Sequence, residues 1–217
     1  MKKKVLIKDR SHHKNYIDVD FIEIGTSDFD TLIESASANT VGFSIEPIKY
    51  YLNNLPDKPN VTKINKAIVG SDYKKNIVTV YYIPSKIIEE KKLPIWLKGC
   101  NSINDYHILH ELSLRHLVKT IDVECQTIGS FLKEYSIRSI KYLKIDTEGN
   151  DIFILRDLYN YLLTKDQKYY PLKIKFETNE WYNRDDIENI KSLYSELNYR
   201  LTYPNKYNTV FILKKFY

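Results

Sequence analysis

The sequence predicts an α/β fold in which a mostly parallel β-sheet is flanked by helices. Stretches with the alternating pattern of strands are separated by stretches with helical periodicity, which is typical of βαβ units. The chain has 217 residues, a length that fits one domain with a sizeable core. Its 43% hydrophobic and 28% charged residues are usual for a globular protein, and its six Gly and seven Pro argue against a long flexible linker.

The expected strands are short runs rich in Val, Ile, Phe and Tyr that end at a glycine, a proline or an acidic turn. They cover residues 19–25, 40–47, 61–70, 140–146 and 172–178. The expected helices carry apolar residues at three- and four-residue spacing. They cover residues 30–37, 48–55, 151–163 and 185–198. The last two runs, 199–204 and 208–215, alternate like an antiparallel terminal hairpin.

Residues 75–128 interrupt this alternation. Two strand-like runs, 76–84 and 116–128, enclose the turn-rich 93–105 and the helical pattern of 106–117. We predict a single domain, 1–217, with an inserted β-pair and loop before the fourth strand. At the carboxyl ends of the strands this insertion would wall a ligand pocket, and at the opposite ends it would be decoration.

Composition limits the partners and the cellular compartment that we expect for the protein. The net charge of +5 is mild, so nucleic acid is not expected as a partner. Cys100 and Cys125 are too few for a disulfide framework and lack metal-site spacing. No stretch approaches the ~18 apolar residues of a membrane span, and no secretory signal is recognisable. We therefore expect a cytoplasmic protein with no membrane partner.

The turn after the first strand indicates a nucleoside ligand. A single glycine, Gly25, stands where dinucleotide folds have Gly-x-Gly-x-x-Gly, and Phe29 occupies a crowded position, which argues against NAD or FAD. The chain also has no P-loop. Glu46 ends the second strand, where an acid can accept hydrogen bonds from ribose hydroxyls. S-adenosylmethionine fits such a site, whereas a plain turn at Gly25 and a helix N-terminal acid at Glu46 are the structural alternatives.

Five stretches taken in order resemble FkbM-family S-adenosylmethionine-dependent methyltransferases: "DFIEIGTSDFD", "GFSIEP", "INKAIVG", "GCNSI" and "YLKIDTEGND". The family's Leu-Lys-Ile-Asp-x-Glu-Gly element is "LKIDTEG" at 143–149. The resemblance covers roughly residues 18–180 and implies a class I, Rossmann-like methyltransferase fold. The family's first motif, Asp-x-Gly-x-Asn-x-Gly, is altered here, because Glu23, Ser27 and Phe29 replace its first acid, its Asn and its second Gly.

The resemblance also implies where the cofactor binds. The turn after the first strand should contact the methionine and ribose, with Glu23 beneath it as ligand contact or structural brace, and Glu46 should hold the ribose hydroxyls. Ile45 or Pro47 should flank the adenine. The implied cofactor-binding residues are Glu23, Gly25, Thr26, Ser27, Glu46, Pro47, Ala67 and Asp146.

The catalytic candidates are Asp146, Glu148 and His107. Asp146 ends the fourth strand, where a carboxylate can orient the cofactor or take a proton from a substrate hydroxyl, although it could instead cap the next helix. Glu148 is the second carboxylate. His107 follows the family-like "GCNSI" loop and is a candidate base, although an ordinary amphipathic helix would also explain it.

Substrate contacts are expected from Ser102, Glu177 and Asn179. Because Asp146 ends one strand and Glu177 and Asn179 end the next, Mg²⁺ could bind there, but we do not favour it and assign no metal ligand. Trp96 either packs the inserted loop or faces the substrate.

The acceptor is expected to be a hydroxyl. The chain lacks the Asn/Asp-Pro-Pro-aromatic stretch of base-amino methyltransferases, and Lys144 is expected on the face opposite to Asp146, which disfavours RNA ribose methylation. We predict O-methylation of a sugar, glycan or small metabolite. The expected partner is therefore a small-molecule or carbohydrate acceptor. A homodimer is also compatible with the sequence. The alternatives are a catalytically inactive cofactor-binding partner subunit and an RNA methyltransferase.

Overall fold

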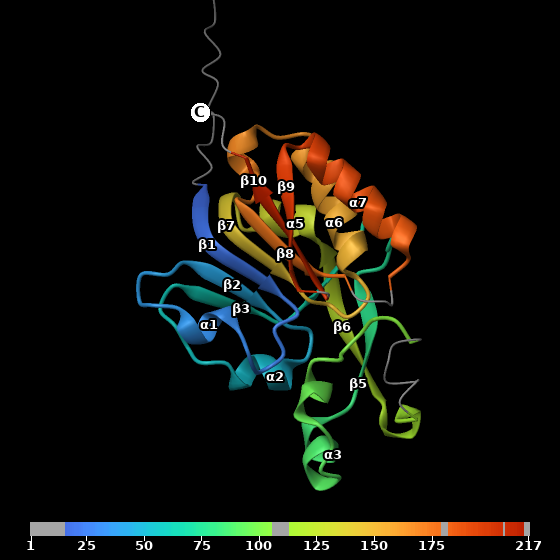
Figure 1. The fold of residues 1–217 in the computed structure, drawn as a ribbon. Helices are drawn as coiled ribbons and strands as arrows, with labels where there is room; N and C mark the ends of the chain where they lie inside the picture. Colours follow the sequence, from blue (N-terminus) through green and yellow to red (C-terminus); the bar gives the residue numbers. More distant parts are fainter. Residues whose placement is uncertain (1–15, 106–112, 179–181, 206, 215–217) are drawn as a thin grey trace, which may run out of the picture.

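The computed structural model describes residues 16–105, 113–178, 182–205 and 207–214. They form a mixed α/β fold around a seven-stranded sheet with the strand order β3-β2-β1-β7-β8-β10-β9 (Figure 1). The strands are β1 Ile17–Ile24, β2 Gly42–Ile45, β3 Val61–Ile64, β7 Ile137–Ile145, β8 Lys173–Glu177, β9 Tyr199–Asn205 and β10 Asn208–Leu213. The first five strands in this order pair in parallel, and β10 pairs antiparallel with both β8 and β9. The predicted mostly parallel sheet is confirmed.

Helices cover both faces of this sheet. One group packs its apolar side chains, such as Phe131, Ile154 and Ile190, into the main core. This group consists of α5 (Ile128–Glu134), α6 (Asp151–Leu162) and α7 (Arg184–Glu196). On the other face, α1 (Leu32–Ser35) and α2 (Lys49–Asn54) pack against the β1–β3 half around Phe21. No helix in the described ranges is both long and apolar enough to cross a membrane.

The prediction of one strand over 61–70 was wrong. The chain bends at Asn65, whose side-chain amide donates to the carbonyl oxygens of Glu46 and Pro47. The second part, β4 (Ala67–Val69), leaves the main sheet and joins a separate three-stranded sheet in the order β4-β6-β5. The bend therefore places Ala67 at the start of a strand and beside the loop after β2.

The insertion contains the predicted β-pair. β5 (Ile77–Tyr82) and β6 (Lys119–Thr127) pair antiparallel, and β4 pairs with β6 in parallel. Short helical segments connect them: α3 Ser85–Glu90, η1 Ile95–Lys98 and η2 Arg115–Leu117, while η3 Gln167–Tyr169 lies later in the chain. Residues 106–112, most of the helix predicted at 106–117, lie outside the described residues.

Two helices of the structure, α3 in the insertion and α5 against the main sheet, were not predicted. The start of α5 was assigned to the end of the strand at 116–128. Ile128, Phe131 and Leu132 have helical spacing, and the Thr127 hydroxyl accepts a hydrogen bond from the backbone N–H of Ser130. This capping pattern was the signal that could have separated strand from helix.

Candidate functional site

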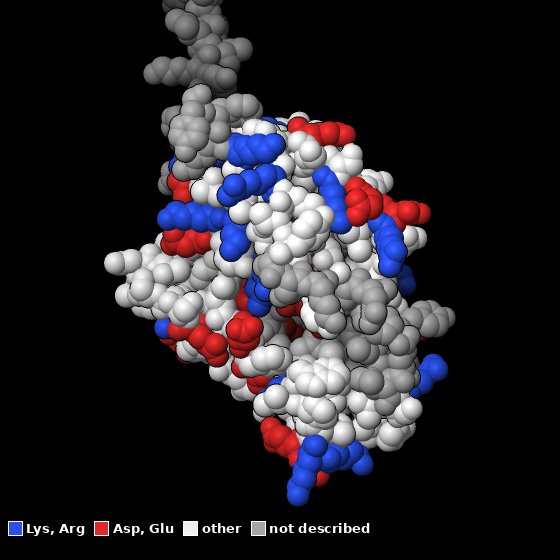
Figure 2. Space-filling model, in the orientation of Figure 1, with Lys and Arg blue, Asp and Glu red and all other residues white. Residues whose placement is uncertain are grey.

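A cavity of about 290 Å³ lies at the carboxyl ends of the parallel strands. Its wall is formed by the loops after β1, β2 and β7, the start of β4 and the insertion. In the space-filling view the described surface is hollowed in this region, and acidic side chains lie in and beside the hollow (Figure 2). The insertion thus lies on the side where a ligand would bind.

Most of the predicted site residues meet in this cavity. Those on its wall are Gly25, Thr26, Ser27, Glu46, Pro47, Ala67, Ser102, Asp146, Glu148 and Glu177. Glu23 is not on the wall. His107 and Asn179 lie outside the described residues. The roles assigned to all these residues stay predictions.

The loop after β1 requires its glycine. Gly25 has φ +79°, and a Cβ there would lie 1.8 Å from the carbonyl oxygen of Asp146. The β1 and β7 loops are therefore in direct contact, and any side chain would separate them. Phe29, which replaces the family's second glycine, lies on the cavity wall with its ring against Gly99 of the insertion. The cavity thus stays open in spite of this replacement.

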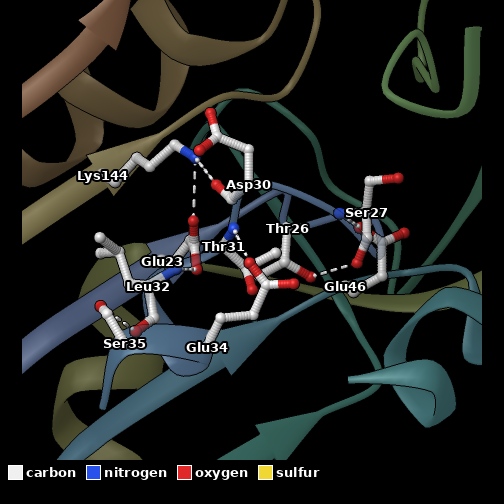
Figure 3. Close-up of polar contacts among 10 residues, drawn as sticks. All are labelled: Glu23, Thr26, Ser27, Asp30, Thr31, Leu32, Glu34, Ser35, Glu46 and Lys144. Carbon is white, nitrogen blue, oxygen red and sulfur yellow. Dashed lines mark hydrogen bonds and ion pairs between the residues drawn. The ribbon is translucent and has the colours of Figure 1, made fainter. Parts of the chain in front are cut away.

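Glu46 is buried with its carboxylate held by the backbone. Its Oε2 accepts from the N–H of Ser27 at 2.8 Å (Figure 3). Its Oε1 accepts from the N–H of Ile48 at 2.9 Å. Burial raises the pKa of Glu46 from its ordinary 4.5 to about 7, and these hydrogen bonds only partly oppose the effect. Glu46 therefore holds the backbone before α2, and the same residue also lines the cavity.

Glu23 and Lys144 form a buried ion pair beneath the β1 loop. The Lys144 ammonium donates to Glu23 Oε1 at 2.9 Å and to the carbonyl oxygen of Asp30 at 3.3 Å (Figure 3). The Leu32 N–H donates to Glu23 Oε2 at 2.8 Å. Burial raises the pKa of Glu23, and the nearby Lys144 charge partly offsets this. Glu23 therefore braces the loop rather than facing the cavity.

The expectation that Lys144 faces away from the site was wrong. It lines the cavity together with Asp146. Residues two apart along a strand point to the same side, so alternation itself places Lys144 on the side of Asp146, which directly follows β7. Burial alone would lower the pKa of Lys144, but the carboxylates of Glu23 and Asp146 outweigh it and raise the pKa. Lys144 therefore stays charged.

Replacing Lys144 with methionine is expected to lower the free energy of unfolding by about 3–5 kcal/mol, because Glu23 would keep a buried charge without its cation. Urea unfolding at pH 7 measures this loss. The Glu23→Gln/Lys144→Met double variant is the control and should recover part of the stability. A Lys144→Met protein as stable as the wild type would contradict the bracing role.

Three carboxylates converge at the end of β7. Asp146, Glu148 and Glu177 can each offer one oxygen such that all three oxygens lie within 4.8 Å of one another. The pKa of Asp146 is raised from its ordinary 3.8 to about 7. Burial is the largest cause, and repulsion from the charges of Asp151 and Glu148 adds to it. Such a group can accept a proton near neutral pH. Oxygen donors of this kind also suit Mg²⁺, which stays a prediction that we do not favour.

Two residues that hold this loop were missed at the sequence level. Asp151 is fully buried and accepts hydrogen bonds from Thr147 and from the backbone N–H of Glu177. The Tyr182 hydroxyl oxygen accepts from the backbone N–H groups of Gly149 and Asp151. Asp151 carried only the signal of a helix start, and Tyr182 carried none. The alternative that Asp146 caps α6 was wrong, because Asn150 occupies the N-cap position.

The insertion bridges the two loops of the cavity. Ser27 Oγ donates to the carbonyl oxygen of Lys98 at 3.0 Å, and the Lys98 ammonium lies 3.5 Å from Asp28. At the other end, Ser102 Oγ donates to the carbonyl oxygen of Glu148 at 2.6 Å. Between them, Trp96 lines the cavity with 46% of its surface exposed. The insertion therefore walls the pocket and presents an aromatic ring at its edge.

Neither cysteine is placed for nucleophilic chemistry. Burial raises the pKa of Cys100 far above its ordinary value, and burial also raises that of Cys125. The reactive thiolate is therefore scarce at neutral pH. Besides Cys100, the ionisable groups on the cavity wall are carboxylates and the two lysines Lys66 and Lys144.

The comparisons with known proteins agree with this geometry. The model of one family, the methyltransferase FkbM domain, matches residues 23–201. The match includes the loops after β1, β2 and β7 and the whole insertion. A search of the curated proteins found no match.

Proposed function

Because the chain belongs to the family of FkbM methyltransferase domains, we propose that it transfers a methyl group from S-adenosylmethionine to a hydroxyl oxygen of a carbohydrate or small metabolite. The observation that carries this proposal is the presence of two differently held carboxylates, Glu46 and Asp146, on one cavity wall. The first suits a ribose and the second suits proton transfer. The proposed enzyme is the whole chain, 1–217, acting as one domain.

The residues of the cavity fit S-adenosylmethionine. A carboxylate has about four lone-pair positions, and the backbone N–H groups of Ser27, Ile48 and Thr26 take up to three of them at Glu46, so at least one remains for a ribose hydroxyl. Ile45, Pro47 and Ala67 supply apolar surface for the adenine beside it. When bound, S-adenosylmethionine would supply a methyl group on a positively charged sulfur.

The protein's own contribution is to position the acceptor and take its proton. Asp146, with a pKa of about 7, can accept the proton that a hydroxyl loses as its oxygen gains the methyl group. Glu148 and Glu177 can accept hydrogen bonds from neighbouring hydroxyls. The insertion forms part of the cavity wall and can hold the acceptor in line with the methyl group, so that positioning supplies much of the rate.

Two alternatives are less well supported. A partner subunit without catalysis was suggested by the altered first motif, but Phe29 packs against Gly99 and leaves the cavity open. RNA methylation would use lysines around the acid. Lys144 lies there, but Glu23 and the Asp30 carbonyl already engage its ammonium group.

Calorimetric titration of the purified chain with S-adenosylhomocysteine tests the proposal, followed by transfer of a radiolabelled methyl group to a panel of sugars. Parallel assays with Mg²⁺ and with EDTA measure any need for metal. We expect micromolar binding of one molecule per chain and labelling of a hydroxyl-bearing acceptor. No binding would leave a scaffold role, whereas labelling of RNA in place of sugars would select the RNA alternative.

A further inference from the structure

One half of the main sheet has a face that no described helix covers. Helices α5, α6 and α7 lie on the opposite face, where Leu143, Ile174 and Phe211 point into the main core. The short helices α1 and α2 cover the near face only over β1–β3. In Figure 1 the strands β8, β10 and β9 accordingly face the viewer without a helix in front of them.

The strand register places cations in rows on this uncovered face. Tyr142 pairs with Lys173, Lys173 pairs with Ile212, and Ile212 pairs with Arg200. One step closer to the carboxyl ends of β7 and β8, Lys144 pairs with Lys175. Registered neighbours point to the same side of a sheet, so Lys173, Lys175 and Arg200 share this face. We call these three residues the basic face.

The charges of the basic face are not neutralised within the described chain. Lys173 lies over the ring of Tyr142, with its ammonium 4.5 Å from the ring centre, and none of the three cations forms an ion pair with a described residue. The cations nearby on β7 differ, because Lys144 is paired with Glu23 and Lys141 with Asp20. Lys173 and Arg200 are exposed to solvent, and Lys175 is half-buried.

The basic face leads directly to the cavity. Glu177 follows Lys175 by two residues on the same side of β8 and lies on the cavity wall. Lys175 is also close enough to Asp146 for its positive charge to act on that acid. This charge lowers the pKa of Asp146, although burial and the neighbouring carboxylates raise it overall. In Figure 2, Lys and Arg side chains gather over these strands above the acidic hollow. An acceptor with its hydroxyl at Asp146 could therefore place another group over these cations.

We propose that the basic face binds a phosphate or carboxylate group carried by a carbohydrate acceptor, which makes that acceptor an acidic sugar. This inference rests on the proposed function. Three cations that form no ion pair with a described residue, beside a hydroxyl-binding cavity, complement one or two negative groups. They do not favour RNA, because a chain of phosphates running on to Asp146, Glu148 and Glu177 would meet carboxylates there.

The test measures the affinity of small probes for the protein saturated with S-adenosylhomocysteine. NMR titrations at low and at high salt give each affinity. The probes are glucose 6-phosphate, an oligogalacturonate tetramer, the neutral maltotetraose and a single-stranded RNA 12-mer. We expect at least one acidic sugar to bind, with affinity that falls as salt rises. The two acidic probes distinguish phosphate from carboxylate as the recognised group.

Variants connect this binding to the basic face. Lys173→Gln/Lys175→Gln/Arg200→Gln should bind the acidic sugar at least roughly tenfold more weakly. The charge-retaining Lys173→Arg/Lys175→Arg/Arg200→Lys should keep most of the affinity. Lys86→Gln/Lys91→Gln/Lys119→Gln, which removes three exposed lysines of the insertion, is the matched control and should bind as the wild type does. Thermal unfolding checks that each variant is folded.

Three results would overturn the inference: no binding of either acidic sugar, equal binding of maltotetraose, or preferred binding of RNA. Equal loss of affinity in the control triple variant would also overturn it. Failure of the wild type to bind S-adenosylhomocysteine is a separate result, which removes the proposed function itself.

Discussion

Replacing Asp146 with asparagine is expected to lower kcat for methyl transfer by roughly 10²- to 10⁴-fold, the usual contribution of a positioned general base. Asparagine keeps the shape of the side chain but cannot accept the proton of the acceptor hydroxyl. Binding of S-adenosylhomocysteine should persist, because Glu46 and the β1 loop are unchanged. Initial rates with a saturating acceptor, together with calorimetry, separate these two effects.

The pH dependence gives a second readout of the same group. The pKa of Asp146 is about 7 in the folded protein, against an ordinary value of 3.8. Its contribution to stability is therefore present below pH 4 and is lost as the pH rises through 7, where the acid is charged while partly buried. Wild-type kcat should rise over the same interval as the base loses its proton.

Asp146→Asn should accordingly be more stable than the wild type at pH 8, by at most roughly 4 kcal/mol, and equally stable near pH 4. Urea unfolding at both pH values measures the difference, and Asp72→Asn, at an exposed aspartate, is the control. Retained kcat in Asp146→Asn would exclude Asp146 as the base. If Glu148→Gln then lost the activity, Glu148 would take that role.

The parts of the site at strand ends could be predicted from the sequence. Gly25, Glu46 and Asp146 each terminate an apolar alternating run, and the carboxyl ends of parallel strands meet at one edge of a sheet. Periodicity and topology together therefore bring them into one cavity before any side-chain contact is known. The same argument predicted that the antiparallel pair in the insertion could wall that cavity.

The parts that failed depend on contacts between distant segments. β4 leaves the main sheet because the Asn65 amide bonds to the loop after β2. Lys144 is a different case, because its two-residue spacing from Asp146 already places both side chains on one side of β7. Tyr182 and Glu177 reach the β7 loop and the start of α6 through hydrogen bonds over 26 to 33 residues, which no local pattern encodes. Strand boundaries and buried hydrogen-bond partners are tertiary properties, so periodicity alone could not supply them.

Replacing Glu46 with glutamine is expected to weaken binding of S-adenosylhomocysteine by roughly 10- to 100-fold at pH 8, the equivalent of one or two hydrogen bonds to a charged acceptor. The two carboxylate oxygens accept from backbone N–H groups of Ser27, Ile48 and Thr26, and at least one further lone pair remains for a ribose hydroxyl. Glutamine has one acceptor oxygen, and its amide group would face a backbone N–H donor at the other position.

The sign of the pH effect distinguishes this anchor from a purely structural acid. Because the pKa of Glu46 is about 7, the carboxylate is largely ionised at pH 8 and largely protonated at pH 6. Wild-type affinity should therefore rise between pH 6 and pH 8, whereas Glu46→Gln should bind weakly and almost equally at both. Glu196→Gln, at the end of α7, is the control and should follow the wild type. Affinity in Glu46→Gln that matched the wild type at pH 8 would mean that Glu46 only braces the loop before α2, and the ribose would need another partner.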